Sequence, residues 1–432
     1  MITNPLRTTI KKPERKKMVL FLWLCSSLFL ATARFVLAKA GIVDGLFREV
    51  TLYLIACIPF IYLLTGLSGT NTRIPNAFMF FGGLFLSVVI VFFLSLLFNP
   101  QLSNFYFRKD YGLWPVFRPD GAIFAFLLFS LFDDPKDLRE ILTKAAYVLF
   151  FFQVVVVFLP AFRRGYWIDI APNGSEMHIR YSLSFGYDML FLFIVFFLEG
   201  LRKHKIIHFS LAIVCIILMI TNGGRGAIVV LVLSIAVLLV SNIIDRKTSV
   251  PKKALLISGI VILFLVYCFF FDEIIAFLLK FVTSHNINSR SIEMILNGSF
   301  LGTNGRDRIW AVVIEAIKEG GPFGYGLFGD RPFVAPIHVA GYSHNLFLEL
   351  LVSFGVIGAG IIIYIISDTI KMLFFCKDPE WKTVYFILFS CSCKLLLSFS
   401  LWYTWEFWAA AAVAYKYKTT NKRSNRLVRC DT

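Results

Sequence analysis

The sequence predicts an all-α polytopic integral membrane protein, and three observations lead to that fold class. Of its 432 residues, 58% are hydrophobic and only 16% are charged, whereas soluble domains have about 45–50% apolar and about 25% charged residues. The mean hydropathy is +0.75. Apolar runs of about 20 residues, the length that crosses a bilayer, recur from one end of the chain to the other.

These runs predict about twelve transmembrane helices in two groups. The first group, within residues 18–271, has about nine spans, at 18–38, 49–67, 77–98, 112–132, 141–161, 181–199, 206–221, 225–244 and 254–271. The second group, within residues 343–415, has about three, at 343–366, 383–399 and 400–415. The span at 112–132 is the weakest of the twelve because Arg118 and Asp120 lie inside it, and charged groups are costly in a bilayer.

Basic residues at both ends of the chain indicate its orientation. Lysine and arginine crowd residues 11–17, before the first span, and residues 416–429, after the last one. Such flanks face the cytoplasm, so segments 1–17 and 416–432 are predicted to be cytoplasmic. Residues 272–342 then form one long extracytoplasmic loop. The same placement explains the net charge of +16 without a nucleic-acid partner.

The sequence predicts neither a metal nor a cofactor. It has no glycine-rich phosphate loop, no paired aspartates typical of sugar-nucleotide enzymes and no residues at metal-ligand spacing. Its eight cysteines lie in predicted spans or in the cytoplasmic half, so no disulfide framework is expected.

An amphipathic helix is expected in the long loop, over residues 307–320. Its apolar residues recur at helical spacing: Ile309, Trp310, Val313, Ile314 and Ile317. Gly320-Gly321-Pro322 should end it. We expect this helix to lie on the outer membrane surface with its apolar side facing the lipid.

The predicted external side is rich in arginine, whereas the cytoplasmic loops are rich in lysine. The planar fork of arginine grips phosphate through two hydrogen bonds, so these residues suggest a phosphate-bearing ligand. Pairing with external acids would account for about half of the set, which comprises Arg108, Arg118, Arg163, Arg164, Arg180, Arg225, Arg290, Arg306, Arg308 and Arg331.

Two polar stretches at this surface place arginines near helix starts. In TNGGRGAIVV, residues 221–230, Arg225 begins a span after a hairpin turn. A cation there opposes the helix dipole, which favours a role in holding an anion; the alternative is an interfacial snorkelling arginine. In GTNGRDRIW, residues 302–310, Arg306 and Arg308 stand at the amphipathic helix.

A third stretch, GYSHNLFLELLVSFGVIG at residues 341–358, places His344 at the entrance of a span, with His338 shortly before it. A lone histidine often caps a helix, but Ser343 or Asn345 suits that role better. With an ordinary pKa near 6.5, His344 could accept a proton from a hydroxyl at neutral pH.

Together these stretches resemble the O-antigen polymerase and O-antigen ligase superfamily of bacterial envelope glycosyltransferases. The resemblance covers residues 221–358 directly, and the N-terminal half resembles the family only in topology. It is carried by His344-Asn345 followed after nine residues by Gly355-Val-Ile-Gly358, by the Arg-Gly-Ala of residues 225–227, and by the run Arg306, Trp310, Pro322 and Gly324-Tyr-Gly326.

The resemblance implies a GT-C-like fold and a metal-independent glycosyltransferase of the bacterial cytoplasmic (inner) membrane. Its donor and acceptor would be oligosaccharides linked to a polyprenyl diphosphate, and membrane lipid, a chain-length regulator and a flippase would be its partners. His344 and Arg225 would be catalytic. The diphosphate and glycan would be bound by Arg306, Arg308, His338, Asn345 and Arg290.

The resemblance also implies a partner that orients His344, either a carbonyl or a carboxylate. Glu349 is a weak candidate for that partner because it lies five residues on and off the histidine face of the helix.

Three activities stay open at this point. The first is a polymerase that extends a lipid-linked repeat unit, favoured because such enzymes are numerous and varied. The second is a ligase that moves the finished glycan onto lipid A–core. The third is a transporter of lipid-linked oligosaccharide, which would show internal repeats and a site near mid-membrane; Asp188, Lys394 and Glu406 are the polar residues predicted at that depth.

Overall fold

The structure is a computed structural model that describes most of the chain. The described residues are 12–42, 45–65, 76–108, 112–170, 176–179, 181–222, 224–244, 305–338 and 341–430, with scattered positions between 249 and 302. Most of the predicted span 254–271, most of the loop before residue 305, and Arg290 lie outside them.

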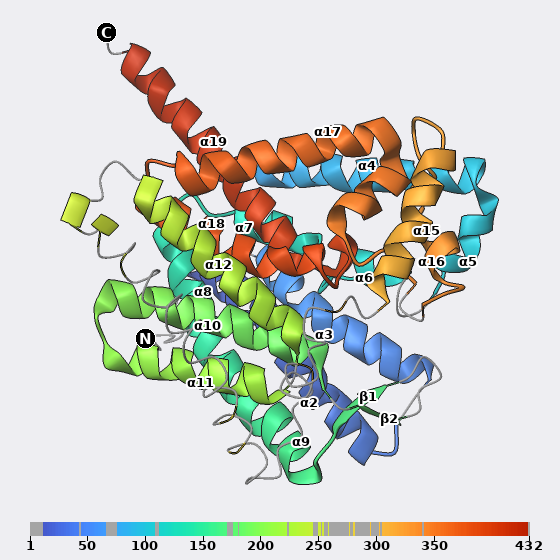
Figure 1. Cartoon of the computed structure of the whole chain (residues 1–432), viewed down its shortest axis with the longest axis horizontal. Coiled ribbons are helices and arrows are strands. Elements are labelled where there is room, and N and C mark those ends of the chain that lie inside the picture. The colour runs from blue at the N-terminus through green and yellow to red at the C-terminus, as the bar shows by residue number, and fades with distance from the viewer. Residues whose placement is uncertain are drawn as a thin grey trace, which may run out of the picture.

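Helices dominate the described residues (Figure 1). The first part of the chain forms α1 (Lys12–Leu24), α2 (Ser26–Lys39), α3 (Leu46–Thr65), α4 (Asn76–Phe98), α5 (Ser103–Tyr106), α6 (Trp114–Phe117), α7 (Phe124–Ser130), α8 (Pro135–Phe152) and α9 (Leu159–Arg164). A π-helical segment, Gln153–Phe158, joins α8 to α9. A short antiparallel hairpin follows, in which β1 (Trp167–Ile170) pairs with β2 (Glu176–Ile179).

The second part of the chain is also helical. It comprises α10 (Leu183–Lys203), α11 (Ile206–Asn222), α12 (Arg225–Ile244), α15 (Arg306–Glu319), α16 (Arg331–Val334), α17 (Leu346–Phe374), α18 (Pro379–Ser392) and α19 (Trp405–Cys430). Short 3-10 turns lie at Pro100–Leu102, Cys393–Leu396 and Leu401–Tyr403.

Several of these helices are long and apolar enough to cross a membrane. Among the described residues six qualify, or seven if the pair α1–α2, bent by 56°, counts as one span. They coincide with the predicted spans at 49–67, 77–98, 141–161, 181–199, 225–244 and 343–366, and the bent pair with 18–38. The chain is therefore a multi-pass membrane protein, and the described residues do not reach the predicted number of twelve.

The predicted span at 112–132 is wrong. This segment forms two short helices, α6 and α7, instead of one long helix. Arg118 pairs with Asp120 through two hydrogen bonds between them, and that charged turn interrupts the apolar run. The side chains of α7 are almost all buried inside the protein, so α7 is a core helix.

The predicted spans at 383–399 and 400–415 also have different limits. Helix α18 ends at Ser392, and α19 begins only at Trp405. The connecting chain is non-helical in part, and its Ser398, Ser400 and Thr404 are fully or nearly fully buried. Irregular backbone at membrane depth is tolerated where protein surrounds it.

Helix α17 is kinked at Gly355, whose φ of 52° and ψ of −124° are not helical. The kink leaves backbone groups of α17 unpaired within the helix, and the preceding loop satisfies them. Tyr325 N–H donates to Val352 O at 2.9 Å, and Val356 N–H donates to Pro322 O at 2.8 Å. The glycine-rich connector 321–330 is thereby fastened to the middle of α17.

Helix α15 confirms the predicted amphipathic helix but not its predicted surroundings. Its buried residues Ile309 and Val313 pack with Val334 of α16 and Val352 of α17. The apolar side therefore faces the protein instead of the lipid, because the kinked part of α17 offers it an apolar partner.

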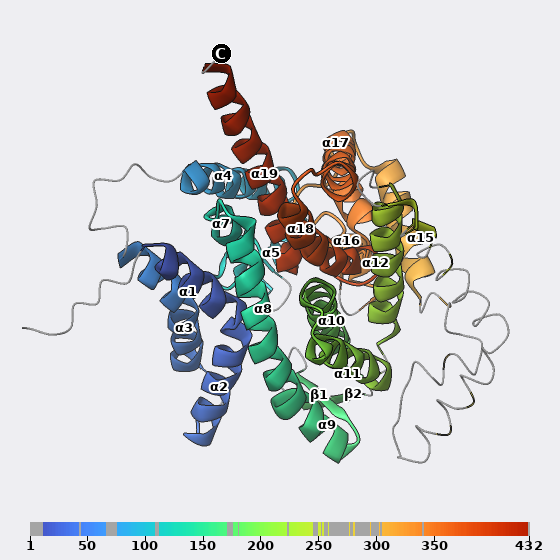
Figure 2. The same ribbon diagram turned by 90° about the vertical axis from the view of Figure 1, so that its left-hand side faces the viewer.

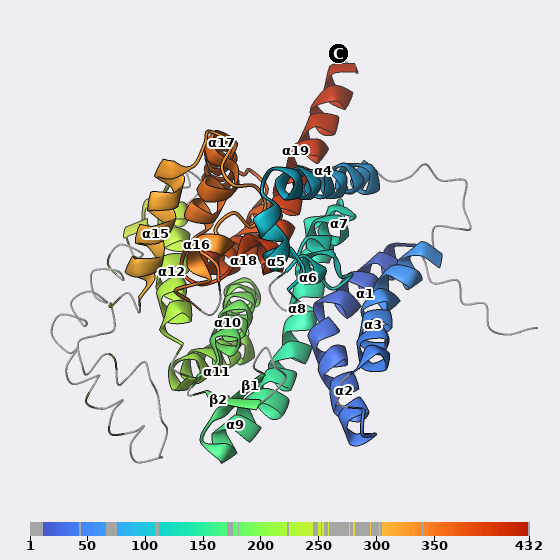
Figure 3. The same ribbon diagram turned by 90° about the vertical axis from the view of Figure 1, so that its right-hand side faces the viewer.

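The bundle is arranged around α10. Figures 2 and 3 show α1, α2 and α3 at one edge and α12, α15 and α17 at the opposite edge, with α8, α10 and α19 between them. Of the apolar window of α10, 72% is buried inside the protein, against 17–33% for the other five long helices. Helix α10 thus supplies rigid support for groups that gather at its N-terminal end.

Candidate active site

His344 lies in the turn that leads into α17. Its backbone has a φ of 52°, in the left-handed region, and its side chain is only 9% exposed. The next residue, Asn345, is the N-cap: its side-chain oxygen accepts hydrogen bonds from the backbone of Phe347 at 3.0 Å and Leu348 at 3.2 Å. Of the two predicted caps, Asn345 fills the role, which leaves the imidazole of His344 for other contacts.

The contacts of His344 determine which ring nitrogen carries the proton. Nδ1 lies 2.6 Å from the backbone oxygen of Ser398. Because a carbonyl only accepts hydrogen bonds, Nδ1 must donate, and Nε2 then keeps a lone pair. Nε2 faces Nδ1 of His338 at 3.4 Å, and the ring of Tyr342 lies 4.3 Å from the His344 ring, centre to centre.

Burial keeps His344 neutral. It lowers the pKa of His344 to about 4, opposed by the bond to Ser398 and assisted by the positive charges of Arg306 and Arg331. Burial and Arg306 also lower the pKa of His338. At neutral pH the imidazole of His344 is therefore a hydrogen-bond acceptor at Nε2, as a general base must be. Of the two partner types that the resemblance implies for His344, a carbonyl or a carboxylate, the structure shows a contact with a carbonyl, that of Ser398.

The side-chain hydroxyl of Ser398 also accepts two hydrogen bonds. Arg306 Nη2 donates to Ser398 Oγ at 3.2 Å, and the hydroxyl of Tyr187, on α10, donates to the same atom at 3.2 Å. Arg306 is the first residue of α15, so the start of that helix points a cation toward the imidazole of His344.

The start of α12 reaches the same place. A Cβ atom added at Gly226 would lie 2.5 Å from the hydroxyl of Tyr187 and 3.7 Å from Ser398 Oγ. A residue with a side chain would force the Tyr187 hydroxyl away from Ser398, which gives a physical reason for the glycine of the Arg-Gly-Ala motif. Arg225, immediately before it, is half-buried and begins α12 as predicted.

The structure thus brings two of the predicted residues, His344 and Arg306, onto Ser398. His338 contacts the ring of His344, and the start of α12 at Arg225 lies nearby through Gly226. Arg308 is exposed, and no described contact ties it to the group. Arg290 lies outside the described residues. Asn345 uses its side-chain oxygen as a helix cap, and a role for it in substrate binding stays a prediction.

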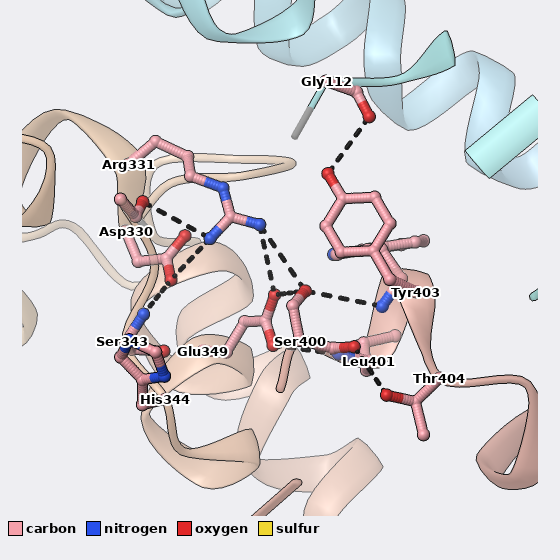
Figure 4. A network of polar contacts seen from close by, with 12 residues as sticks. Gly112, Asp330, Arg331, Ser343, His344, Glu349, Ser400, Leu401, Tyr403 and Thr404 are labelled. Carbon is pink, nitrogen blue, oxygen red and sulfur yellow. Dashed lines mark hydrogen bonds and ion pairs between the residues drawn. The ribbon is translucent and has the colours of Figure 1, made fainter. Parts of the chain in front are cut away.

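A buried polar cluster lies behind His344 (Figure 4). Arg331 stands between Asp330, at 3.3 Å, and Glu349, at 3.9 Å. Asp330 Oδ2 accepts from the backbone N–H of Ser343 at 2.7 Å. Glu349 accepts from the hydroxyl of Ser400 at 2.5 Å. In the part of the chain that the structure describes, the polar contacts of Glu349 are with Arg331, Ser400 and the backbone N–H of Leu401, and none of them is with His344.

Sequence reasoning missed Ser398 and Tyr187. Ser398 was placed inside a predicted span, and it acts partly through its backbone oxygen, which no residue type reveals. Tyr187 is one aromatic among many in α10. In the part of the chain that the structure describes, no three His, Cys, Asp or Glu side chains gather as a metal site requires.

Comparison with known proteins identifies the family. Residues 209–363 match the protein family described as O-antigen ligase. This match places residues 209–363 in the O-antigen ligase and polymerase superfamily. Neither the curated proteins nor the solved structures include a match to this chain.

The O-antigen ligase match runs from α11 into α17 and includes Arg225, Arg306, His338 and His344. The family match indicates a glycosyltransferase-like activity on lipid-linked polysaccharide substrates. Ser398, whose backbone oxygen contacts His344, lies outside the matched residues, between α18 and α19.

Proposed function

We propose that the protein is a polymerase of O-antigen or a similar surface polysaccharide. It transfers a glycan from its polyprenyl diphosphate onto another lipid-linked repeat unit, at the outer face of the bacterial cytoplasmic membrane. The observation that carries the proposal is the arrangement of His344: a neutral imidazole with its basic Nε2 unprotonated, next to the cation of Arg306.

In this mechanism the acceptor hydroxyl attacks the anomeric carbon of the donor glycan. His344 Nε2 takes the hydroxyl proton as the new glycosidic bond forms, while the bond from the anomeric carbon to the diphosphate breaks. The electron pair leaves with the lipid diphosphate. Arg306 and Arg225 stabilise that growing negative charge, a role usually worth several kcal/mol. Binding of the anionic donor would also raise the pKa of His344 toward neutrality and strengthen it as a base.

An apolar cavity next to the site supports a lipid-linked donor. Its volume is about 640 Å³, and its lining includes Leu346 and Leu350 of α17, Leu401, and Ala414 of α19. Leu346 follows His344 by two residues, so a chain in this cavity would end near the imidazole. A polyprenyl tail is apolar and flexible, which suits such a space.

The ligase is the second candidate, because the matching family carries the description O-antigen ligase. A ligase would use the same donor and the same base but a lipid A–core acceptor. The transporter has less support, since its polar residues at mid-membrane depth pair with neighbours: Lys394 with Glu406 at 2.8 Å, and Asp188 with Gln153 at 2.7 Å.

A glycan ladder from a strain lacking the gene, complemented with wild type or with His344→Ala, tests the proposal. We expect His344→Ala to reach the membrane but leave lipid A–core with a single repeat unit. Bare lipid A–core with polymer left on its carrier would identify a ligase instead. A wild-type ladder from His344→Ala would exclude the base role.

His204→Ala is the matched control. His204 ends α10, is exposed, and has the same left-handed φ of 52° as His344. Alanine at either position must adopt the same left-handed backbone, so the two substitutions carry a similar conformational cost. A defect that is specific to His344→Ala therefore reports on the imidazole.

A further inference from the structure

Two buried carboxylates and one buried guanidinium lie behind His344 without contacting its ring nitrogens (Figure 4). Asp330 is 0%, Glu349 1% and Arg331 2% exposed. Burying charges is costly, and a buried ion cluster seldom adds much stability over apolar residues of the same size. Such a cluster does fix the geometry of the backbone segments that it binds. Its hydrogen bonds to neighbouring segments of the same chain therefore indicate which part of the site it holds in place.

One set of hydrogen bonds fixes the segment that immediately precedes His344. The backbone N–H of Ser343 donates to Asp330 Oδ2 at 2.7 Å, and Arg331 Nη1 donates to the backbone oxygen of Gly341 at 3.4 Å. These bonds hold residues 341–343 in place just before the left-handed turn at His344.

A second set fixes the segment that carries the partner of His344. Ser400 Oγ donates to Glu349 Oε1 at 2.5 Å, and the backbone N–H of Leu401 donates to Glu349 Oε2 at 3.2 Å. Arg331 Nη2 donates to Ser400 Oγ at 3.5 Å. Ser400 lies two residues beyond Ser398, so the position of the Ser398 carbonyl depends on these contacts.

We propose that Asp330, Arg331 and Glu349 are positioning residues that clamp these two segments together and thereby fix the orientation and the Nδ1–H tautomer of His344. Arg331 joins the two halves of the clamp, because its two terminal nitrogens reach one segment each. The hydrogen bonds described above are sufficient to support the clamp. Its consequence for catalysis rests on the proposed role of His344.

The tautomer of His344 can be measured directly. The chain has six histidines, so nitrogen NMR of protein labelled with ¹⁵N-histidine in liposomes gives few signals, and His344→Ala assigns the relevant one. We expect the wild-type protein to show the Nδ1–H tautomer. In Ser400→Ala and Arg331→Lys this signal should give way to a mixture of tautomers, because the Ser398 carbonyl is no longer held.

The same variants should slow glycan transfer without weakening donor binding. With purified lipid-linked donor and acceptor, we expect kcat per folded protein to fall about tenfold or more while KM changes little, since misplacement of a catalytic group acts on the transition state. Ser400→Ala is the milder change, and it keeps the test valid if Arg331→Lys fails to fold.

Ser390→Ala is the matched control, because Ser390 of α18 is also 0% exposed. It should leave both the tautomer and kcat as in the wild type. An unchanged Nδ1–H signal in Ser400→Ala and Arg331→Lys would overturn the proposal, as would equal losses in Ser390→Ala. If instead the tautomer shifts as expected but His344→Ala transfers glycan normally, the clamp stands and the proposed role of His344 as the base fails.

Discussion

Replacing Gly355 by alanine should destabilise the protein strongly, whereas the same change at Gly360, in the same helix, should not. A Cβ atom added at Gly355 would lie 2.1 Å from the backbone oxygen of Pro322, far inside van der Waals contact. Its φ of 52° and ψ of −124° are also unfavourable for any residue with a side chain. Around Gly360, nothing lies within 4 Å of the added atom.

The expected loss in free energy of unfolding follows from the backbone strain at Gly355 and from the hydrogen bonds that the kink allows. A strained backbone conformation costs roughly 1–3 kcal/mol. The overlap would also push the connector 321–330 off α17, where three backbone hydrogen bonds join them, from Tyr325, Gly326 and Val356, each worth about 1 kcal/mol. We expect Gly355→Ala to lower the free energy of unfolding by roughly 4 kcal/mol or more. Gly360→Ala should be neutral or stabilise by up to about 1 kcal/mol.

Thermal unfolding of the purified variants in one detergent, followed by tryptophan fluorescence, measures the difference. Activity should fall with stability in Gly355→Ala, because the connector 321–330 ends at Asp330 and is followed directly by Arg331. A melting temperature for Gly355→Ala equal to that of Gly360→Ala would refute the reasoning, since the loop and helix would then not be coupled through this kink.

The other predictions concern single side chains. Arg225→Lys should reduce transfer roughly tenfold or more at equal protein level, because a point charge replaces a planar fork; full activity in a membrane assay would make Arg225 a snorkelling residue. Asn345→Ala should cost about 1 kcal/mol of stability through loss of the cap, measured by thermal unfolding, and Asn345→Asp should retain most of it. Lys394→Met leaves the carboxylate of Glu406 buried without its cation, at a cost of roughly 3–5 kcal/mol, and the double variant with Glu406→Gln should recover most of that loss. Because the pKa of His344 is lowered from 6.5 to about 4 in the folded state, the unfolded chain binds more protons between these values. His344 should therefore contribute a loss of stability as the pH falls from about 6.5 to 4, of roughly 3 kcal/mol in total, and the difference in stability between wild type and His344→Gln across that pH range measures this contribution.

The sequence predicts the helix starts of the site well, because each begins where an apolar run meets polar residues. His344, Arg306 and Arg225 all stand at such boundaries, and the turn before each helix has its own local signal. The helix ended by Gly320 was likewise predictable, since a glycine followed by proline stops a helix wherever it occurs.

The partner of His344 was not predictable. Ser398 lies 54 residues further along the chain, and its backbone oxygen has no residue-type signal. Hydropathy also failed at 112–132 and at 383–415, because it counts apolar residues and cannot distinguish a helix facing lipid from chain buried by its neighbours. The prediction that the apolar side of α15 faces the lipid failed for the same reason.

The left-handed backbone at His344 has a practical consequence for trapping the enzyme with its substrate. Asparagine adopts a φ of about +55° more readily than most residues, whereas valine, isoleucine and threonine strongly resist it. His344→Asn should therefore preserve the shape of the turn while removing the basic nitrogen, and it is the better inactive variant for capturing a bound lipid-linked donor. A β-branched replacement would distort the entrance to α17 and release the donor for reasons unrelated to proton transfer.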